Sequence, residues 1–389
     1  MSEVTKPPIA KKELKKLEIH GVGRDDYYFW LRFKENQEVI DYLTAENDYT
    51  KEKTKHLNAF TEELFLEMKN RIKEDDESVP YKYKDYYYYD KDVKGKEYKI
   101  YCRKHQNLDA EEEVLLDLNE LAKDFEYYKL RTFKISPNQK FLAYSVDTTG
   151  YEKFFINIKD LETNETYSPG IENIGWNFEW GDDSTIFYNV RDEAQRPYML
   201  KRHILGDLPE RDVVIFEEHD IERRVSVWKS RDHKFLFMKS ESTLSSEIRF
   251  LDLNKPLGKF KIFYPREEEH EYIISHKDDY FYVVTNSENS TNFRLIRTPV
   301  ENIGKENWEE ILAHNRDVRV QYIEPFEQFM VIYKREEGLP KVDIFYEIND
   351  ERNHSIDFPE SVYSVWRGNN HEYTSEFYRL NYTSLVTPK

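Results

Sequence analysis

Cysteine and long apolar segments are what this 389-residue sequence has least of. Its single cysteine, Cys102, excludes an internal disulfide, a Cys-x-x-Cys redox pair and a thiolate zinc cage, and favours a reducing cytoplasm. No apolar run reaches the length of about 18 residues that a membrane helix needs. The polar N-terminus "MSEVTKPPIAKKELKKLEIHG" also lacks the apolar core of a signal peptide. We therefore expect a cytoplasmic chain with no visible secretion signal and no membrane contact.

Positive charge is scarce as well. The chain carries 76 acidic and 58 basic residues, for a net charge of −18. Nucleic acid and anionic membranes need a basic footprint, so neither is expected as a partner. An acidic surface attracts cations and basic peptides, although dispersed acidic residues also simply keep a protein in solution.

The glycines and histidines do not form a known catalytic or ligand-binding motif. No two glycines lie four residues apart, which excludes the strict Gly-x-Ser-x-Gly elbow of a serine hydrolase. The "GVG" at Gly21 lacks a third glycine, and we expect no strand before it, so it is not a dinucleotide fingerprint. His270 and His371 each precede a glutamate, but Ile274 and Ser375 stand where a zinc site would need the second histidine. No cofactor or metal is expected.

The chain up to about Ile72 is expected to be helical. Val39, Ile40 and Leu43 gather at helical spacing, and a second apolar series follows at steps of four (Phe60, Leu64, Met68, Ile72). These two amphipathic helices each need a partner for one face. The acidic segment "KEDDESVP" then ends the pattern, because proline disfavours helix in the residue before it.

After this segment, a four-stranded unit repeats. It is clearest from Phe133, in "FKISPNQKFLAYSVDTTGYEKFFINIKDLETNETYS", where three turns separate four strands. The turn after the first strand recurs to give seven copies, at "KYKDYYYYD", "SPNQKFLAY", "GDDSTIFYNV", "SRDHKFLFMK", "HKDDYFYVVT", "PFEQFMVIY" and "GNNHEYTSEFYRLNY". Units of this length and order predict an all-β fold, a seven-bladed β-propeller. Two stacked β-sandwich domains are the alternative.

Two further features of the sequence are three acidic runs and an incomplete last repeat. The runs 74–77, 111–113 and 267–269 are interpreted as solvated loops, or alternatively as the lining of the propeller's tunnel. In the last copy, "FYRLNYTSL" matches the second strand and "VTPK" the following hairpin. We therefore expect six complete blades and a half-blade after Ser361, with the chain interrupted inside the seventh.

Many segments, in order, resemble the N-terminal part of the prolyl oligopeptidase family of serine peptidases. They include "YFWLRFKENQEVIDYLTAENDYT", "EDDESVPYKYKDYYYY", "ISPNQKFLAYSVDTTGYE", "DEAQRPYMLKRHILGD", "HEYIISHKDDYFYVVTN", "NFRLIRTPV", "EEGLP" and "LNYTSLVTPK". The "RPY", "HEY", "NFRL" and "EGLP" segments favour the oligopeptidase B branch. The resemblance runs from about Asp26 to the last residue.

This resemblance implies cytoplasmic enzymes that cleave short peptides, in this branch after Arg or Lys. A propeller (here residues 74–389) caps an α/β-hydrolase domain, on which the helical segment (residues 1–73) would pack. The catalytic Ser, Asp and His lie in the hydrolase domain, which this sequence lacks, so no catalytic residue is assigned and the chain alone is predicted to be inactive. An ion-pair latch between domains matches Glu126, in "FEYYKL", and more weakly Arg103, in "YCRK"; both could instead be ordinary surface charges.

Three functions are consistent with these features. The first is a non-catalytic part that gates and filters short basic peptides for an oligopeptidase B-like peptidase. The second is a free-standing propeller that serves as a protein-interaction platform. The third is an enzyme that acts through a site without a known motif.

Overall fold

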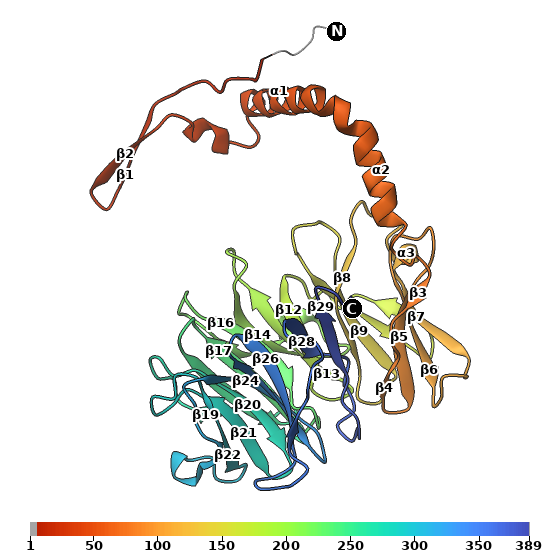
Figure 1. The fold of residues 1–389 in the computed structure, drawn as a ribbon, viewed down its shortest axis with the longest axis vertical. Coiled ribbons are helices and arrows are strands. Elements are labelled where there is room, and N and C mark those ends of the chain that lie inside the picture. Colours follow the sequence, from red (N-terminus) through yellow and green to blue (C-terminus); the bar gives the residue numbers. More distant parts are fainter. Residues whose placement is uncertain (1–5, 389) are drawn as a thin grey trace. The chain divides into compact units, whose positions relative to one another are not determined.

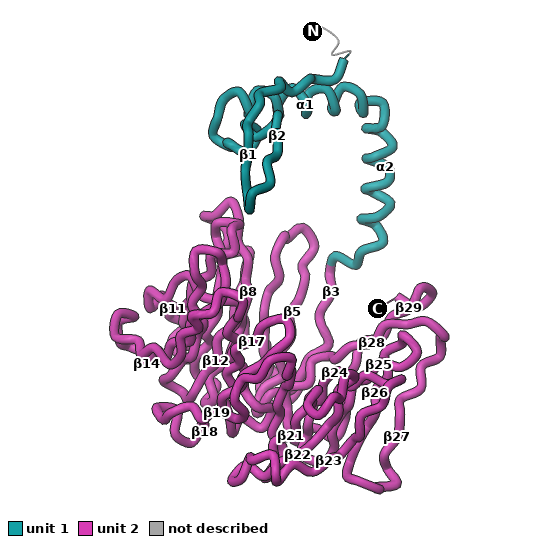
Figure 2. Tube along the Cα trace, turned by 90° about the vertical axis from the view of Figure 1, so that its left-hand side faces the viewer, with its two compact units in different colours: residues 1–74 teal, residues 75–389 magenta. Residues whose placement is uncertain are grey.

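The structure, a computed structural model, describes residues 6–388 and forms two compact units, which meet in the sequence between Glu74 and Asp75 (Figure 2). The first five residues of the expected helical segment and Lys389, at the end of the expected final hairpin, lie outside the described residues. Within residues 6–388, no helix is both long enough and apolar enough to cross a bilayer.

The first unit begins with a β-hairpin, which corrects the expectation of helix throughout this segment. Strands β1 (Lys15–Ile19) and β2 (Val22–Asp26) pair antiparallel with Ile19 opposite Val22. The two residues between them, His20 and Gly21, both have positive φ (54° and 75°), as a tight two-residue hairpin loop requires. A strand therefore does precede the "GVG", and its first glycine serves a turn.

The helices of the first unit begin later than the sequence suggested. A short 3-10 helix, η1 (Phe29–Arg32), precedes α1 (Gln37–Thr54), whose N-cap Asn36 accepts a hydrogen bond from the Glu38 amide at 2.9 Å. A 3-10 turn, η2 (Lys55–Leu57), leads into α2 (Asn58–Lys69), which ends before Ile72. The apolar series predicted for α2 is exposed, and so is Leu43 of α1. Within the described part of the first unit, both helices thus leave apolar side chains exposed.

The second unit is a β-propeller, as the repeat predicted, in which successive antiparallel sheets follow one another along the chain (Figure 1). We number the sheets as blades 1 to 7. Blade 1 contains β3 (Asp76–Glu77), β4 (Tyr81–Tyr83), β5 (Tyr86–Asp92), β6 (Ile100–His105) and β7 (Glu112–Asp117), followed by the short helix α3 (Leu118–Leu121). Both β3 and β4 pair with β5, so the first strand of blade 1 is broken around Pro80.

Blades 2 to 6 each contain four strands in meander order. Blade 2 contains β8 (Lys129–Ile135), β9 (Phe141–Asp147), β10 (Phe155–Asp160) and β11 (Thr166–Tyr167). Blade 3 contains β12 (Ile174–Trp180), β13 (Thr185–Arg191), β14 (Pro197–Ile204) and β15 (Val213–Glu217), with η3 (Pro209–Arg211) between the last two. Blade 4 contains β16 (Arg224–Lys229), β17 (Phe235–Glu241), β18 (Ser246–Asp252) and β19 (Lys261–Tyr264).

The last three blades complete the series. Blade 5 contains β20 (Tyr272–Lys277), β21 (Tyr280–Thr285), β22 (Arg294–Pro299) and β23 (Glu309–Leu312), with η4 (Lys305–Asn307) before the last. Blade 6 contains β24 (Val318–Pro325), β25 (Met330–Glu336), β26 (Leu339–Phe345) and β27 (His354–Ser355). Blade 7 contains β28 (Tyr363–Arg367) and β29 (Leu380–Ser384). The described residues after Ser361 thus form two strands, as predicted.

The core lies between blades. The second strand of a blade is covered on both faces by its neighbours, so it is almost entirely apolar and buried, as in β9 and β21. Six apolar clusters fill the six spaces between consecutive blades, from blade 1 against blade 2 to blade 6 against blade 7. A smaller apolar cluster of Tyr89, Ile100 and Cys102 lies on the side of blade 1 that faces away from blade 2.

The meander order gives the propeller two distinct faces. We call the end where the first strand of every blade begins the strand-start face. The strand-start face also carries the connections between the second and third strands and those from one blade to the next. The opposite end, where the first strand turns into the second, is called the inner-turn face. Side chains from successive inner turns meet there around the propeller axis.

Candidate functional site

The inner turns close the propeller axis, because side chains from blades far apart in the sequence meet across it. The ring of Tyr83, at the end of β4, lies 5.6 Å from the ring of His233, in the inner turn of blade 4. Arg231, from that same turn, donates a hydrogen bond to the Asn370 carbonyl of blade 7 and lies 3.1 Å from a carboxylate oxygen of Glu324 in blade 6. Blade 4 thus contacts blades 1, 6 and 7.

Glu324 is the centre of the buried part of this site. Its carboxylate accepts a hydrogen bond at 2.6 Å from the Tyr378 hydroxyl and lies 3.3 Å from the Arg367 guanidinium in addition to Arg231. The glutamate side chain is only 5% exposed and that of Arg231 17%. The Arg231 guanidinium also packs 4.4 Å from the centre of the Phe326 ring. We call Arg231, Glu324, Arg367 and Tyr378 the axial cluster.

Desolvation sets the protonation states around the axial cluster. Burial raises the pKa of the Tyr378 hydroxyl, and the adjacent Glu324 charge raises it further. Burial, and to a smaller extent neighbouring cations, lower the pKa of His233 and of His371 to about 4. Both residues are exposed to solvent, although neighbouring protein atoms surround each imidazole on its other sides. They are therefore neutral at pH 7 and act as stacking surfaces, His371 on Tyr81 at 4.2 Å.

Lys229, which lies near the axis, also has a shifted pKa. Burial lowers the pKa of Lys229, at the end of β16, to about 8, with Glu179 opposing the shift. Lys134 pairs with that same Glu179 at 2.8 Å. No serine or cysteine hydrogen-bonded to a base belongs to this set of residues. The contacts among these residues hold the inner turns together across the axis.

Neighbouring blades are also tied to one another near the inner-turn face. The backbone amide of Lys84, in blade 1, donates to Glu372 of blade 7 at 2.5 Å, and its ammonium group donates to the Pro137 carbonyl of blade 2. Further ties join Asn138 to Asp183, Asn177 to Val227, His276 to Asp232, Lys277 to Glu327 and Glu327 to Tyr373. Every pair of adjacent blades is joined by at least one of these bonds.

Blades 7 and 1 are joined without strand pairing among the described residues. The connection is made instead by the loop between β28 and β29. Besides the Glu372 bond and the stacked His371, Arg379 donates to the Pro80 carbonyl at 2.5 Å. The break at Pro80 in the first strand of blade 1 leaves that carbonyl available.

The structure does not bring the two predicted latch residues together. Glu126 is exposed in the connection between blades 1 and 2 on the strand-start face and has no ion-pair partner within residues 6–388. Arg103, on β6, is 4% exposed and donates to both carboxylate oxygens of Glu113, at 2.7 and 2.8 Å. It also donates to the Gln139 carbonyl at 3.0 Å. Arg103 therefore ties blade 1 to blade 2, toward the inner-turn face.

Two of the three acidic runs, 111–113 and 267–269, do not line the propeller axis. Glu112 and Glu113 lie on β7, the outermost strand of blade 1. Glu112 accepts hydrogen bonds from Tyr89 and Lys91, both at 2.5 Å. Residues 267–269 lie in the connection between blades 4 and 5, on the strand-start face. The tunnel-lining alternative is not supported for these two runs.

The axial cluster was not identified from the sequence. Its members look like ordinary charged and aromatic residues when each is considered alone. The repeat contained a signal nonetheless, because Arg231, Glu324 and Arg367 all lie at or beside the turn that ends the first strand of their blade. Equivalent positions in a closed ring converge on its axis.

Comparisons with known proteins agree with this fold. The family described as "Prolyl oligopeptidase, N-terminal beta-propeller domain" matches residues 7–389. Dipeptidyl aminopeptidase BI of Pseudoxanthomonas mexicana is 34% identical over 100% of this chain, which covers 56% of that protein. Protease 2 of Moraxella lacunata is also 34% identical, over 99% of this chain and 56% of its own length. The chain thus spans little more than half the length of these relatives.

Solved structures give the same picture. Oligopeptidase B from Leishmania major superposes with a TM-score of 0.90 at 27% identity, over 99% of this chain and 58% of that one. Oligopeptidase B from Trypanosoma brucei, in a closed form with covalently bound antipain, gives 0.87 at 26% identity, over 98% and 58%. The chain therefore belongs to the prolyl oligopeptidase family, of which it contains the N-terminal β-propeller.

Proposed function

We propose that this chain is the gating and substrate-filtering part of an oligopeptidase B-like serine peptidase that cleaves short peptides after Arg or Lys. The closed axis is the observation that carries this proposal. With the inner-turn face held shut by the axial cluster and the contacts around it, a peptide can reach the strand-start face only from the side of the partner domain. Such a route excludes folded proteins by size.

The strand-start face has the surface that a partner domain requires. Exposed apolar residues gather in the connections at this end, more than at the inner-turn face: Phe125, Tyr127, Tyr151, Ile221, Leu244, Val362, Leu385 and Val386. The inner-turn end carries Leu108, Leu208, Leu257, Ile348 and Phe377. Exposed apolar surface of this kind is common at sites where another domain docks. We propose that an α/β-hydrolase domain covers this face and also the exposed faces of α1 and α2.

Glu126 fits an interdomain latch in this arrangement. It is exposed, has no ion-pair partner among the described residues and lies on the face proposed for docking. An arginine or lysine of the hydrolase domain is its proposed partner. Arg103 would have to leave both Glu113 and the Gln139 carbonyl to take the same role, so we assign the latch to Glu126.

Opening and closing of the two domains would admit the peptide and then exclude water from the reacting groups. We propose that one hinge is the segment 73–80 and that the enzyme works in the cytoplasm, where its single buried thiol stays reduced. The net charge of −18 would speed the capture of basic peptides. Raising the ionic strength should therefore lower kcat/KM of the complete enzyme, and a salt-independent value would contradict the charge argument.

The proposal is tested with the chain alone and with the chain joined to the C-terminal part of Protease 2 from Moraxella lacunata. We expect no hydrolysis of a chromogenic peptide ending in Arg by the chain alone, and hydrolysis by the joined protein. In the joined protein, opening the axis with the double variant Arg231→Ala/Glu324→Ala should allow cleavage of longer peptides. Activity of the chain alone that co-purifies with it through several columns would overturn the proposal.

The interaction platform is the second candidate, and the apolar strand-start face is equally suited to an unrelated partner. Genomic sequence distinguishes the two. Codons after that of Lys389 that encode further strands and a Gly-x-Ser-x-Gly elbow would support the peptidase, whereas unrelated sequence there would support the platform.

A further inference from the structure

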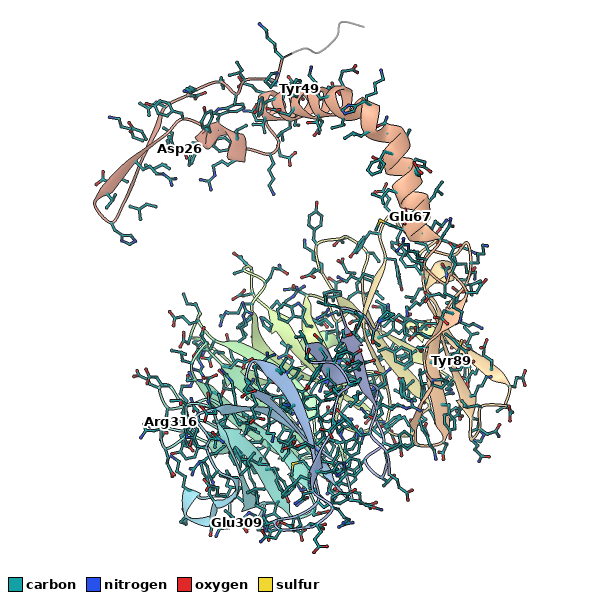
Figure 3. The ribbon with its side chains drawn as sticks, in the orientation of Figure 1. Asp26, Tyr49, Glu67, Tyr89, Glu309 and Arg316 are labelled. Carbon is teal, nitrogen blue, oxygen red and sulfur yellow. The ribbon has the colours of Figure 1, made fainter. Side chains whose placement is uncertain are left out.

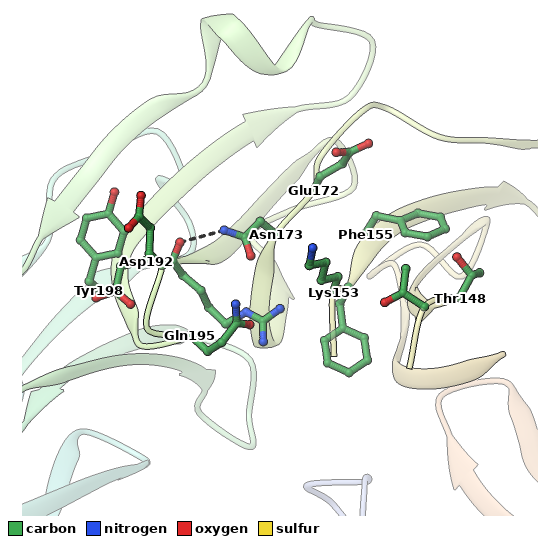
Figure 4. A pocket seen from close by; sticks show the side chains of 12 residues that line it. Thr148, Lys153, Phe155, Glu172, Asn173, Asp192, Gln195 and Tyr198 are labelled. Carbon is green, nitrogen blue, oxygen red and sulfur yellow. Dashed lines mark hydrogen bonds between the residues drawn. The ribbon is translucent and has the colours of Figure 1, made fainter. Parts of the chain in front are cut away.

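A cavity of about 700 Å³ opens on the strand-start face between blades 2 and 3. It is bounded by the β9–β10 hairpin, by the connection into β12 and by the β13–β14 hairpin, and Figure 4 shows Lys153, Asn173 and Tyr198 around it. Phe154, Phe155 and Tyr198 provide aromatic walls. A volume of this size lies within the range of roughly 300 to 1,000 Å³ that is common for small-molecule sites.

Arg191, the last residue of β13, forms the polar floor of this cavity and is poorly satisfied. Arg191 is only 3% exposed. Of the five N–H groups of its guanidinium, one donates to the Glu152 carbonyl, and the buried Nε has no acceptor. A buried cation with free donors is costly unless an anion completes its shell.

The protein itself does not provide that anion. Asp147 and Glu152 lie close enough to raise the pKa of Arg191, but burial outweighs them and the pKa is lowered. Neither carboxylate bonds to the guanidinium. Asp147 is already engaged by the hairpin, since it accepts from the Thr149 amide and the Glu152 amide, both at 2.8 Å. Asn173 uses its amide to hold the Arg191 carbonyl at 2.8 Å (Figure 4).

The three segments that bound the cavity each turn through a residue with left-handed backbone. Glu152, Asn173 and Gln195, one from each bounding segment, all have positive φ, at 57°, 52° and 66°. Asn173 and Gln195 line the cavity directly.

The rim adds a preference for positive charge on the ligand. Asp192 is neutralised by Arg196, whose Nε lies 2.8 Å from its carboxylate. Glu172 and Glu193 are exposed and form no ion pair within residues 6–388, whereas Lys153 is the one basic group at the rim among the residues that line the cavity. A ligand with a carboxylate at the floor would thus present its other end to two free glutamates.

We propose that this cavity binds the C-terminus of a short peptide, with the terminal carboxylate on Arg191 and a basic C-terminal side chain toward Glu172 and Glu193. The inference deepens the proposed function, because cleavage after Arg or Lys releases products with this end. The cavity lies on the face proposed for the hydrolase domain, where such products would emerge. Arg191 provides planar N–H donors that match a carboxylate.

The test measures binding by isothermal titration to the intact chain, so it does not depend on any peptidase activity. The probes are acetyl-Ala-Phe-Arg with a free carboxylate, the same peptide as its C-terminal amide, and acetyl-Ala-Phe-Gln with a free carboxylate. We expect the acid to bind at least about tenfold more tightly than the amide, because a charge-assisted hydrogen bond is lost in the amide. The difference should disappear in Arg191→Gln.

Arg202→Gln is the matched control. Arg202 also has a buried Nε without an acceptor, but it lies on β14 against the Pro256 carbonyl of blade 4 and does not line the cavity. Its variant should keep the preference for the acid, and near-ultraviolet circular dichroism confirms that both variants are folded. No saturable binding, equal binding of acid and amide, or a preference that survives Arg191→Gln would each overturn the proposal.

The rim is tested separately with Glu172→Gln/Glu193→Gln, two exposed changes that leave the floor intact. The preference for the Arg-ending acid over the Gln-ending acid should fall in this variant. An unchanged preference would overturn the assignment of the basic side chain. Because binding and hydrolysis are measured on different proteins, failure here is distinguishable from failure of the gating role.

Discussion

Glu324→Gln is the perturbation that tests the axial cluster most directly. The change keeps the shape of the side chain and an oxygen that can accept from Tyr378, but it removes the charge opposite Arg231. Removing one partner of a buried pair typically costs about 3 to 5 kcal/mol, because the remaining charge is left uncompensated. Arg231 is 17% exposed and keeps the Asn370 carbonyl and the Phe326 ring. We therefore expect a loss of about 2 to 4 kcal/mol in the free energy of unfolding.

Glu309→Gln is the control. Glu309 lies at the periphery of the propeller on β23 and pairs with Arg297 at 2.7 Å, but it is 49% exposed (Figure 3). Arg297 also keeps a second carboxylate, that of Glu347, at 3.0 Å. Exposed pairs of this kind contribute under about 1 kcal/mol. The two substitutions are chemically identical, so their difference isolates burial.

Urea unfolding followed by tryptophan fluorescence and far-ultraviolet circular dichroism provides the measurement. Coincident transitions show that one free energy describes the reaction, and an unchanged m value shows that the denatured state is not altered. A double-mutant cycle with Arg231→Met then gives the coupling between the two side chains. If Glu324→Gln costs no more than Glu309→Gln, and the cycle shows no coupling, the argument for the axial cluster is wrong.

Three further predictions follow from individual side chains. Because the pKa of His233 and of His371 is about 4 in the fold against an ordinary 6.5, the unfolded chain binds more protons between these values. The stability that these two histidines contribute should therefore be lost as the pH drops from about 6.5 to about 4, and the double change to Asn should flatten this part of the pH dependence in urea titrations at each pH. Cys102 is 1% exposed and burial raises its thiol pKa to about 12, so a disulfide reagent at pH 8 should label it only as fast as the protein opens; rapid labelling of the native chain would contradict this. Gly181→Ala would place a methyl group 2.7 Å from the fully buried Phe187 ring and should cost about 1 to 3 kcal/mol in thermal or urea unfolding, whereas an unchanged midpoint would show that this ring can move aside.

The blades could be predicted from the sequence because their signal is repeated. Most second strands contain a short apolar or aromatic run, most first turns have polar or small residues, and seven copies of the pattern reinforce one another. The hairpin at residues 15–26 has no such reinforcement. Its strands, "KKLEI" and "VGRDD", are mostly charged and exposed, so no period distinguished them from loop or helix. The dipeptide His20-Gly21, between two pairing residues, was the local signal available.

The candidate sites could not be predicted in the same way. The resemblance to a family indicated Glu126 and Arg103, but only the folded structure shows that Arg103 is bound to Glu113 and Gln139. Arg191 ends an ordinary buried strand, and its unpaired donors depend on where two neighbouring hairpins place their carbonyls. Such properties belong to the packing of segments and have no counterpart in local sequence.

The closure of the ring links stability to the proposed gating. Six spaces between blades are filled by apolar clusters, but blade 7 meets blade 1 mainly through Glu372, His371 and Arg379, which form polar and stacking contacts. These residues belong to the loop whose Asn370 carbonyl also binds Arg231 across the axis. A change that loosens the seam between blades 7 and 1 should therefore also loosen the axis, because one loop serves both. The contacts that close the axis and those that close the ring therefore depend on the same loop, between β28 and β29.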